Sequence, residues 1–216
     1  MDRDDRWFPR LMSVPGVDYQ SPAGLDRIRL PGYDAQPTVR TTYLLDDSSA
    51  SRRYLLWPSA DGETSASPAQ AWAGYSRPDV SEARAALFQL YEALELPGTL
   101  NDYHFRLQGC CAILWRARLT EPELLAEVER LCLTDLQLIE IYPDIITPVG
   151  QGSGSLHVST CDQLISLYEH EGMLHEALAI AERGQRLNQD TMIRAVTRLR
   201  ERVVSLEAET EDAGHG

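Results

Sequence analysis

Apolar residues at helical spacing between residues 79 and 206 constrain the fold of this chain more than any other feature of its sequence. Leu87, Leu90 and Leu94, for example, recur at i, i+3 and i+7, which places them on one face of a helix. The same kind of stripe predicts further helices over residues 101–118, 120–133, on both sides of Gly172 within 164–187, and 190–207. The sequence therefore predicts a mainly α-helical protein.

The segment "TDLQLIEIYPDIITPV" (134–149) is compatible with two structures. It is either a short helix that Pro143 ends or a buried extended run. We favour a helix through Tyr142, followed by coil. The glycine- and serine-rich residues 150–160 then predict a flexible connection.

The first 78 residues do not share the helical period. Residues 1–24 are rich in Pro, Asp, Gly and Ser, which predicts a loose arm. The stretch "LDRIRL" (25–30) favours a strand, and residues 58–78 have the composition of a linker. Within that linker, Trp72 and Tyr75 are possible anchors on the helices.

Residues 38–57 predict a β-hairpin. The stretches "TVRTTYLL" and "RRYLLW" are rich in strand-forming residues, and they flank the turn-prone "DDSSAS" at 46–51. Because an isolated hairpin is marginally stable in water, we expect this one to dock on the helices or to pair with another chain.

Three regions follow from these patterns. Residues 1–78 are an extended, partly disordered arm with the hairpin and the linker, 79–208 are a helical domain, and 209–216 are a disordered acidic tail. The predicted fold class is mainly α, with antiparallel helical hairpins or an irregular bundle and a small N-terminal β-hairpin or extended arm.

The stretch "LISLYEHEGMLHEALAIAERGQRL", residues 164–187, resembles a tetratricopeptide repeat (TPR). Leu164 and Tyr168 match the large positions of the first helix, and Gly172 matches the turn glycine. Ala177 matches the most demanding small position, and Gly184 a further small position where the helices approach closely.

Three residues depart from the TPR pattern. Ile165 replaces a small residue, Ala181 replaces an aromatic one, and Gln189 stands where proline often ends the unit. The resemblance covers residues 158–190, and residues 109–133 form only a degenerate second hairpin. The alternative is a generic helical hairpin in an irregular bundle.

The resemblance implies a binding surface for a partner protein. In this family the concave surface is lined by first-helix residues that face away from the packing seam. Here these are Ser159, Asp162, Ser166 and Glu169, with His170 beside them. The cationic clamp that some relatives use for carboxylates is missing from this repeat, so an acidic groove would prefer a basic or polar segment.

The charge of the chain supports the same kind of partner. The formal charge is −13, and residues 79–216 hold 23 acidic and 11 basic side chains, whereas residues 1–78 hold ten and nine. Such an acidic helical domain is poorly suited to a phosphate backbone. A basic protein surface would suit it better, and the alternative is that the charge only provides solubility.

The last helix carries an apolar seam at spacings of four and three residues. The seam consists of Met192, Val196, Leu199, Val203 and Leu206. It predicts either a capping helix that shields the last repeat or a short coiled-coil contact in a homodimer.

Chemical motifs are sparse, and we predict no catalytic, cofactor-binding or metal-binding set. The chain has no lysine, which excludes lysine nucleophiles and a Walker-type phosphate loop. All four cysteines lie in apolar helical patterns that favour core packing. His157 and Cys161 have a metal-compatible spacing, but a third ligand is not evident. No apolar run is long enough for a membrane span and no secretory signal is evident, so we expect a cytoplasmic protein.

Three functions remain open at this point. We favour an adaptor or scaffold that binds a polar or basic protein segment, and we expect nucleic acid and membranes not to be partners. The first alternative is an enzyme with a site between the N-terminal region and the helices. The second is a regulatory protein linked to nucleic acid, with Arg40, Arg52 and Arg53 as a contact patch.

Overall fold

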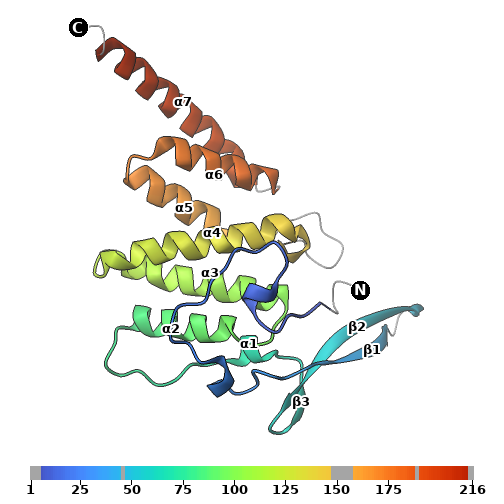
Figure 1. Cartoon of the computed structure of the whole chain (residues 1–216). Coiled ribbons are helices and arrows are strands. Elements are labelled where there is room, and N and C mark those ends of the chain that lie inside the picture. The colour runs from blue at the N-terminus through green and yellow to red at the C-terminus, as the bar shows by residue number, and fades with distance from the viewer. Residues whose placement is uncertain (1–5, 45–46, 147–157, 188–189, 214–216) are drawn as a thin grey trace. The chain divides into compact units, whose positions relative to one another are not determined.

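The computed structural model describes residues 6–44, 47–146, 158–187 and 190–213. These residues form seven α-helices and one three-stranded antiparallel sheet (Figure 1). The predicted fold class, mainly α with a small N-terminal β-hairpin, is confirmed. The chain divides into two compact units, unit 1 (Met1–Leu124) and unit 2 (Leu125–Gly216). That residues 79–208 form a domain that folds by itself stays a prediction.

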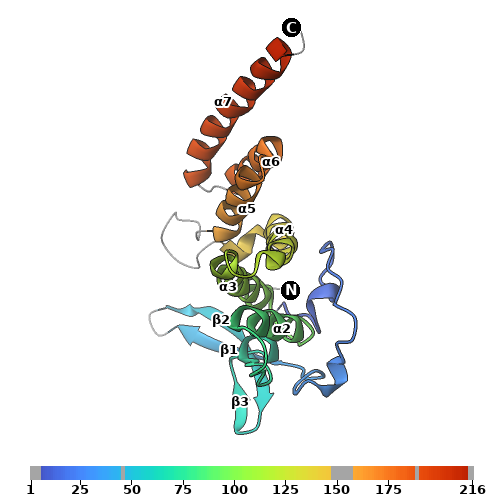
Figure 2. The ribbon, with the colours of Figure 1, turned by 90° about the vertical axis from the view of Figure 1, so that its left-hand side faces the viewer.

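Unit 1 contains three helices, α1 (Pro68–Ala71), α2 (Glu82–Leu94) and α3 (Leu100–Ala117). Helices α2 and α3 form an antiparallel hairpin, seen in both ribbon views (Figures 1 and 2). Their facing stripes supply most of the buried side chains of the unit, including Leu90 and Leu107. Thr99 and Asp102 form a capping box at the start of α3.

The sheet of unit 1 has the order β1-β2-β3, with β1 (Thr38–Leu44), β2 (Asp47–Ser59) and β3 (Gly62–Thr64). Strands β1 and β2 confirm the predicted hairpin, and residue 41 lies opposite residue 53. The short strand β3 was not predicted, because three residues are too few to show an alternating pattern. It pairs only with the last three residues of β2.

The N-terminal segment of unit 1 has little regular structure, yet it contributes to the core. Leu11, Val14 and Tyr19 are all buried, although we expected a loose arm. The predicted strand at residues 25–30 is wrong, since Arg27–Arg29 form a 3-10 helix. The Asp26 carboxylate accepts a hydrogen bond from the Ile28 N–H and so caps this turn.

The linker region docks on the helices through the predicted anchor Trp72. Its indole N–H donates to the buried Glu92 carboxylate at 3.0 Å. The Gln89 side chain donates to the Trp72 carbonyl at 3.0 Å, and the Tyr75 ring lies edge-on to the indole. The linker is therefore held against α2.

Unit 2 contains four helices: α4 (Leu125–Ile141), α5 (Ser159–His170), α6 (Leu174–Arg186) and α7 (Asp190–Ala213). Helix α4 confirms the helical alternative for residues 134–141 and ends one residue before the predicted Tyr142. A 3-10 helix at Pro143–Ile146 stands where we expected coil. Of the predicted connection 150–160, residues 150–157 lie outside the described residues.

Helix α7 extends beyond its predicted end near residue 207, up to Ala213. The added residues are mostly Glu and Ala, which are strong helix formers. They can therefore continue the helix without an apolar stripe to pack.

Candidate interaction surface

The structure places the five predicted surface residues on one side of α5. Ser166 and His170 are exposed, whereas Ser159, Asp162 and Glu169 are partly exposed. The opposite side of the helix is buried and carries Leu164 and Tyr168, as expected from the spacing. The five residues thus form a continuous polar strip along the helix.

Glu169 does not contribute a lone negative charge to this strip. Its carboxylate accepts from Arg198 of α7 at 2.8 Å and also from Arg202, one helical turn further on. The hydrogen bond from Arg198 lowers the pKa of Glu169, and the charge of Arg202 lowers it further. The α5–α7 surface, defined here as the five predicted residues with Arg198 and Arg202, is therefore mixed in charge.

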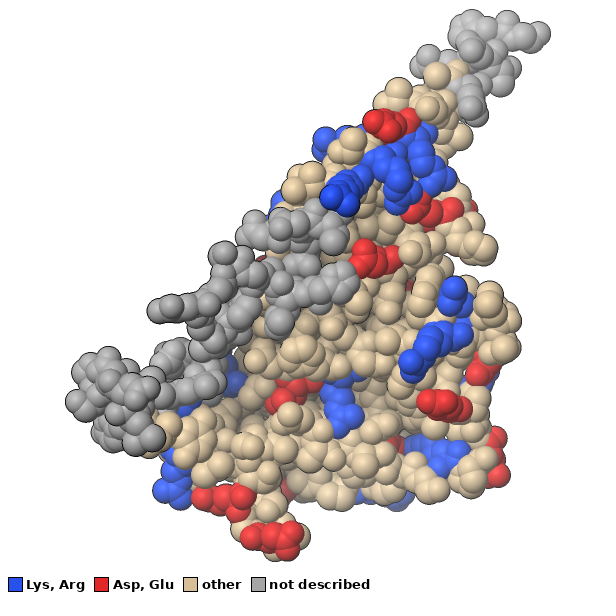
Figure 3. All heavy atoms as spheres, turned by 180° about the vertical axis from the view of Figure 1, so that it is seen from behind, with Lys and Arg blue, Asp and Glu red and all other residues tan. Residues whose placement is uncertain are grey.

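The two arginines are the residues of this surface that sequence reasoning missed. Their i, i+4 spacing places them on one face of α7, which is a detectable signal. The sequence did not show that this face meets α5. Figure 3 shows basic side chains gathered in this region with acidic ones at the edge of the group. Arg198 and Arg200 of α7 pair with Glu169 of α5 and Glu182 of α6.

The α5–α6 turn has the geometry expected from its glycine. Gly172 has a φ of 76°, in the left-handed region that glycine adopts without strain. The Met173 N–H donates to the Tyr168 carbonyl at 2.8 Å, and the Gly172 N–H donates to the Glu169 carbonyl at 3.3 Å. This pair of hydrogen bonds is a Schellman motif, which ends α5 and starts α6.

Small residues allow the helices of unit 2 to approach closely. Ala177 is fully buried, as expected of the demanding small position. A Cβ atom at Gly184 would lie 2.8 Å from the Met192 side chain and 3.1 Å from the Cys161 sulfur. Gly184 is thus the residue that lets α5, α6 and α7 meet at one point.

Polar ties hold α5 and α6 against α4. The buried Asp135 carboxylate accepts from the Thr160 hydroxyl at 2.6 Å, close to the α5 N-terminus. The Tyr168 hydroxyl donates to Glu129 at 2.7 Å, and burial together with this bond raises the pKa of Tyr168. Such ties fix the orientation of α5, so its polar strip is presented rigidly.

Helix α6 contributes a further polar contact to α4. Arg183 of α6 makes a two-point contact with Glu140 of α4, with both distances at 2.8 Å. Burial raises the pKa of the Cys161 thiol to about 12, with the nearby carboxylates adding to the effect. Cys161 therefore stays protonated and acts as a core residue, as predicted for the cysteines.

The apolar seam of α7 is used within the chain. Four of its members are buried against α6, whereas Leu206 is 42% exposed. The buried members are Met192, Val196, Leu199 and Val203. This arrangement is the one that the capping alternative describes, and a homodimer through the seam stays a prediction.

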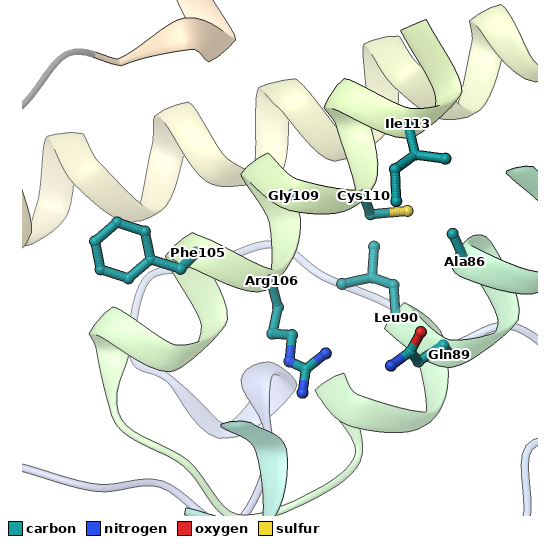
Figure 4. Close-up of a pocket in the computed structure, with 8 residues that line it drawn as sticks. All are labelled: Ala86, Gln89, Leu90, Phe105, Arg106, Gly109, Cys110 and Ile113. Atoms are coloured by element: carbon teal, nitrogen blue, oxygen red, sulfur yellow. The ribbon is translucent and has the colours of Figure 1, made fainter. Parts of the chain in front are cut away.

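Unit 1 has a small cleft between α2 and α3, with a volume of about 200 Å³ (Figure 4). Arg106 donates to the carbonyls of Ala69 and Trp72, at 3.0 and 2.8 Å, and also to that of Gln70. The polar groups of the cleft are therefore engaged in holding the end of α1. Gln89, the other polar residue of the lining, donates to the Trp72 carbonyl, and most of the remaining lining is apolar.

A larger groove of about 570 Å³ lies between the sheet and the start of α3 in unit 1. It is the concavity that an enzyme with a site beside the N-terminal region would use. Its carboxylate, Asp102, accepts from the Thr99 N–H and hydroxyl, both at 2.8 Å, and so serves as a helix cap. Arg40, from the predicted nucleic-acid patch, pairs with Glu63 at 3.2 Å.

Within the described residues, no three His, Cys, Asp or Glu side chains are grouped as metal ligands. None of the helices in the described part of the chain is long and apolar enough to cross a membrane. No protein-family model matches the sequence, and no curated protein or solved structure is significantly similar to it.

Proposed function

We propose that this protein is a protein-interaction adaptor or scaffold that binds a polar segment of another protein on its α5–α7 surface. The observation that carries the proposal is the contrast between the two sides of α5. One side is buried and packs through small and apolar residues. The other side carries the polar strip, in which Ser166 and His170 are exposed. We also propose that α5 and α6 form a TPR-like hairpin.

The chemistry of the surface defines the segment that it would accept. Asp162 is partly exposed, and the carboxylate of Glu169 is bonded to two arginines. A segment with hydroxyl or amide groups and one basic side chain complements this pattern better than a strongly basic one. The large negative charge of residues 79–216 would steer such a segment toward the protein.

We place this interaction in the cytoplasm. All four cysteines are buried as thiols, the state that a reducing compartment maintains.

A quantitative affinity capture from the native host tests the proposal with a double variant, Asp162→Asn with Ser166→Arg. The arginine places bulk and positive charge in the middle of the strip, at an exposed position that tolerates it. We expect the partner recovered by the wild-type chain to fall at least tenfold. Glu169 is left unchanged because its substitution would also remove its ion pairs with Arg198 and Arg202 of α7.

The matched control is Glu176→Arg, an exposed change on α6 outside the α5–α7 surface. It should recover the partner as the wild type does. Equal recovery by the double variant would refute the surface assignment, as would loss of the partner with the control.

A further inference from the structure

In the described part of the β1–β2 hairpin of unit 1, the buried side chains lie near its base. Trp57 and Leu55 are buried, and the Trp7 ring packs edge-on against Trp57 at 5.7 Å. Strand β3 pairs with residues 57–59 alone, so the rest of the hairpin is a two-stranded ribbon. Figures 1 and 2 show this ribbon projecting from the helices of its unit. Such a ribbon gains little stability by itself.

Among the described residues, no strand pairs with the outer edge of β1. Strand β1 is the end strand of the sheet, and residues 38–42 are all exposed. Its sequence begins TVRTT, which is rich in β-branched residues and contains neither proline nor lysine. A strand edge of this kind displays unpaired N–H and C=O groups to any extended chain.

The one charge on this part of the edge is engaged within the chain. Arg40 pairs with Glu63 of β3 at 3.2 Å, and the Thr38 hydroxyl donates to the same carboxylate at 3.1 Å. Natural sheets usually place a charge on an edge to repel other strands. Here that charge is neutralised, so the edge is not protected.

We infer that β1 pairs with β1 of a second copy of this chain. In an antiparallel register centred on Thr41, residue 41 faces itself across a two-fold axis, and Arg40 faces Thr42. No two like charges among residues 38–42 then lie directly opposite each other. The strand is thus self-complementary, as a two-fold symmetric interface requires.

Pairing of this kind joins the two sheets into one continuous sheet, with the order β3-β2-β1 followed by β1-β2-β3 of the second copy. Each ribbon gains a neighbour on its open edge, which removes the instability of an isolated hairpin. This dimer does not depend on the proposed adaptor function. If both hold, the assembly carries two α5–α7 surfaces and binds a bivalent partner more tightly than one copy does.

Disulfide trapping of the full chain tests both the interface and its register. Residues that face each other across an antiparallel pair have Cα atoms about 4.5–5.5 Å apart, within the range for a disulfide. We expect Thr41→Cys to give a covalent dimer under mild oxidation. The chain's own cysteines are buried and should give little background.

Val39→Cys is the matched control, since Val39 is exposed on the same strand. In the proposed register residue 39 faces residue 43, so the two copies of residue 39 lie about 13 Å apart along the strand. It should stay monomeric on non-reducing gels. Failure of Thr41→Cys to crosslink, or equal crosslinking of both variants, would overturn the proposal.

Sedimentation with charge variants gives a second, non-covalent test. Thr41→Asp and Thr41→Lys each place like charges opposite each other across the dimer axis, and each should weaken the dimer by about fivefold. Thr41→Lys also adds a like charge opposite Arg53 within its own hairpin, whereas Thr41→Asp does not, so only a loss seen with both variants is assigned to the dimer. An equimolar mixture of the two variants should restore it. A monomeric wild type would overturn the proposal and leave the edge to a strand of another protein. A dimer that neither variant affects would also overturn it and point to the α7 seam.

Discussion

The connection of the α2–α3 hairpin is covered by chain that lies far away in the sequence, whereas the connection of the α5–α6 hairpin is closed by its own backbone. In unit 1, Phe8 and Gly98 exchange two backbone hydrogen bonds, at 2.9 and 3.0 Å. The buried Tyr103 hydroxyl lies 2.9 Å from the Leu96 carbonyl, and burial raises its pKa well above the ordinary value. In unit 2, the exposed Gly172 turn needs only its Schellman bonds.

The difference shows two ways to build the same motif. The first hairpin depends on the N-terminal segment to cover it, and the second depends on one residue with a left-handed backbone. All four tryptophans lie in unit 1, so fluorescence reports its unfolding selectively, whereas far-UV circular dichroism reports both units.

Leu11→Ala should have the largest effect. Leu11 is fully buried, so its truncation should lower the free energy of unfolding of unit 1 by about 3 kcal/mol. The adjacent Met12→Ala is the control, since Met12 is 41% exposed. Urea unfolding followed by tryptophan fluorescence measures both. Equal, small effects would mean that the N-terminal segment does not cover unit 1.

Gly98→Ala should have the second-largest effect and lower the free energy of unfolding of unit 1 by about 2 kcal/mol. The added Cβ would lie 2.8 Å from the Ala69 Cβ, and Ala69 is tied to the same connection by a 3.0 Å bond to the Pro97 carbonyl. The α1 helix cannot move away without losing that bond. Gly109→Ala on α3 meets no atom within 4 Å and should stabilise the same fluorescence transition slightly.

Gly172→Ala should lower the free energy of unfolding of unit 2 by about 1 kcal/mol, and here the cause is not a steric contact. Its Cβ would meet nothing within 4 Å, so the whole effect comes from the left-handed backbone. The loss should appear in circular dichroism and not in fluorescence. Gly172→Asn should lose less, because asparagine tolerates this conformation. A larger loss with Asn than with Ala would contradict this explanation.

Glu169→Gln should have the smallest effect, below about 1 kcal/mol at pH 7, since its arginine partners are about half exposed. The pKa of Glu169 is lowered in the folded state, so its stabilisation is present above the ordinary value of 4.5. It is lost as the pH falls through the folded-state value. The difference in free energy of unfolding between wild type and variant, measured with urea, should therefore be constant above about pH 5. It should approach zero in acid. A gap that persists at low pH would exclude the ion pair as its cause.

The sequence by itself was sufficient where neighbours in the chain decide the structure. Helical spacing predicted α2 to α7, because residues three and four apart share a face. The turn at Gly172 followed from the backbone freedom of glycine. The close approach at Gly184 was predicted from the TPR resemblance. The five residues on the outer side of α5 were predicted from the TPR resemblance, and helical spacing explains why they share one side of the helix.

Only the tertiary structure decided which elements meet. Glu169 and Arg198 are 29 residues apart, and Tyr103 and Phe8 are 95 residues apart. No local pattern encodes such pairs, since they depend on how separate elements pack. The N-terminal segment therefore packs on its unit, although the sequence predicted a loose arm. The predicted acidic groove likewise has a mixed charge, because arginines of α7 lie beside it. The open edge of β1 is also a tertiary property, because a strand's sequence does not state how many neighbours it has.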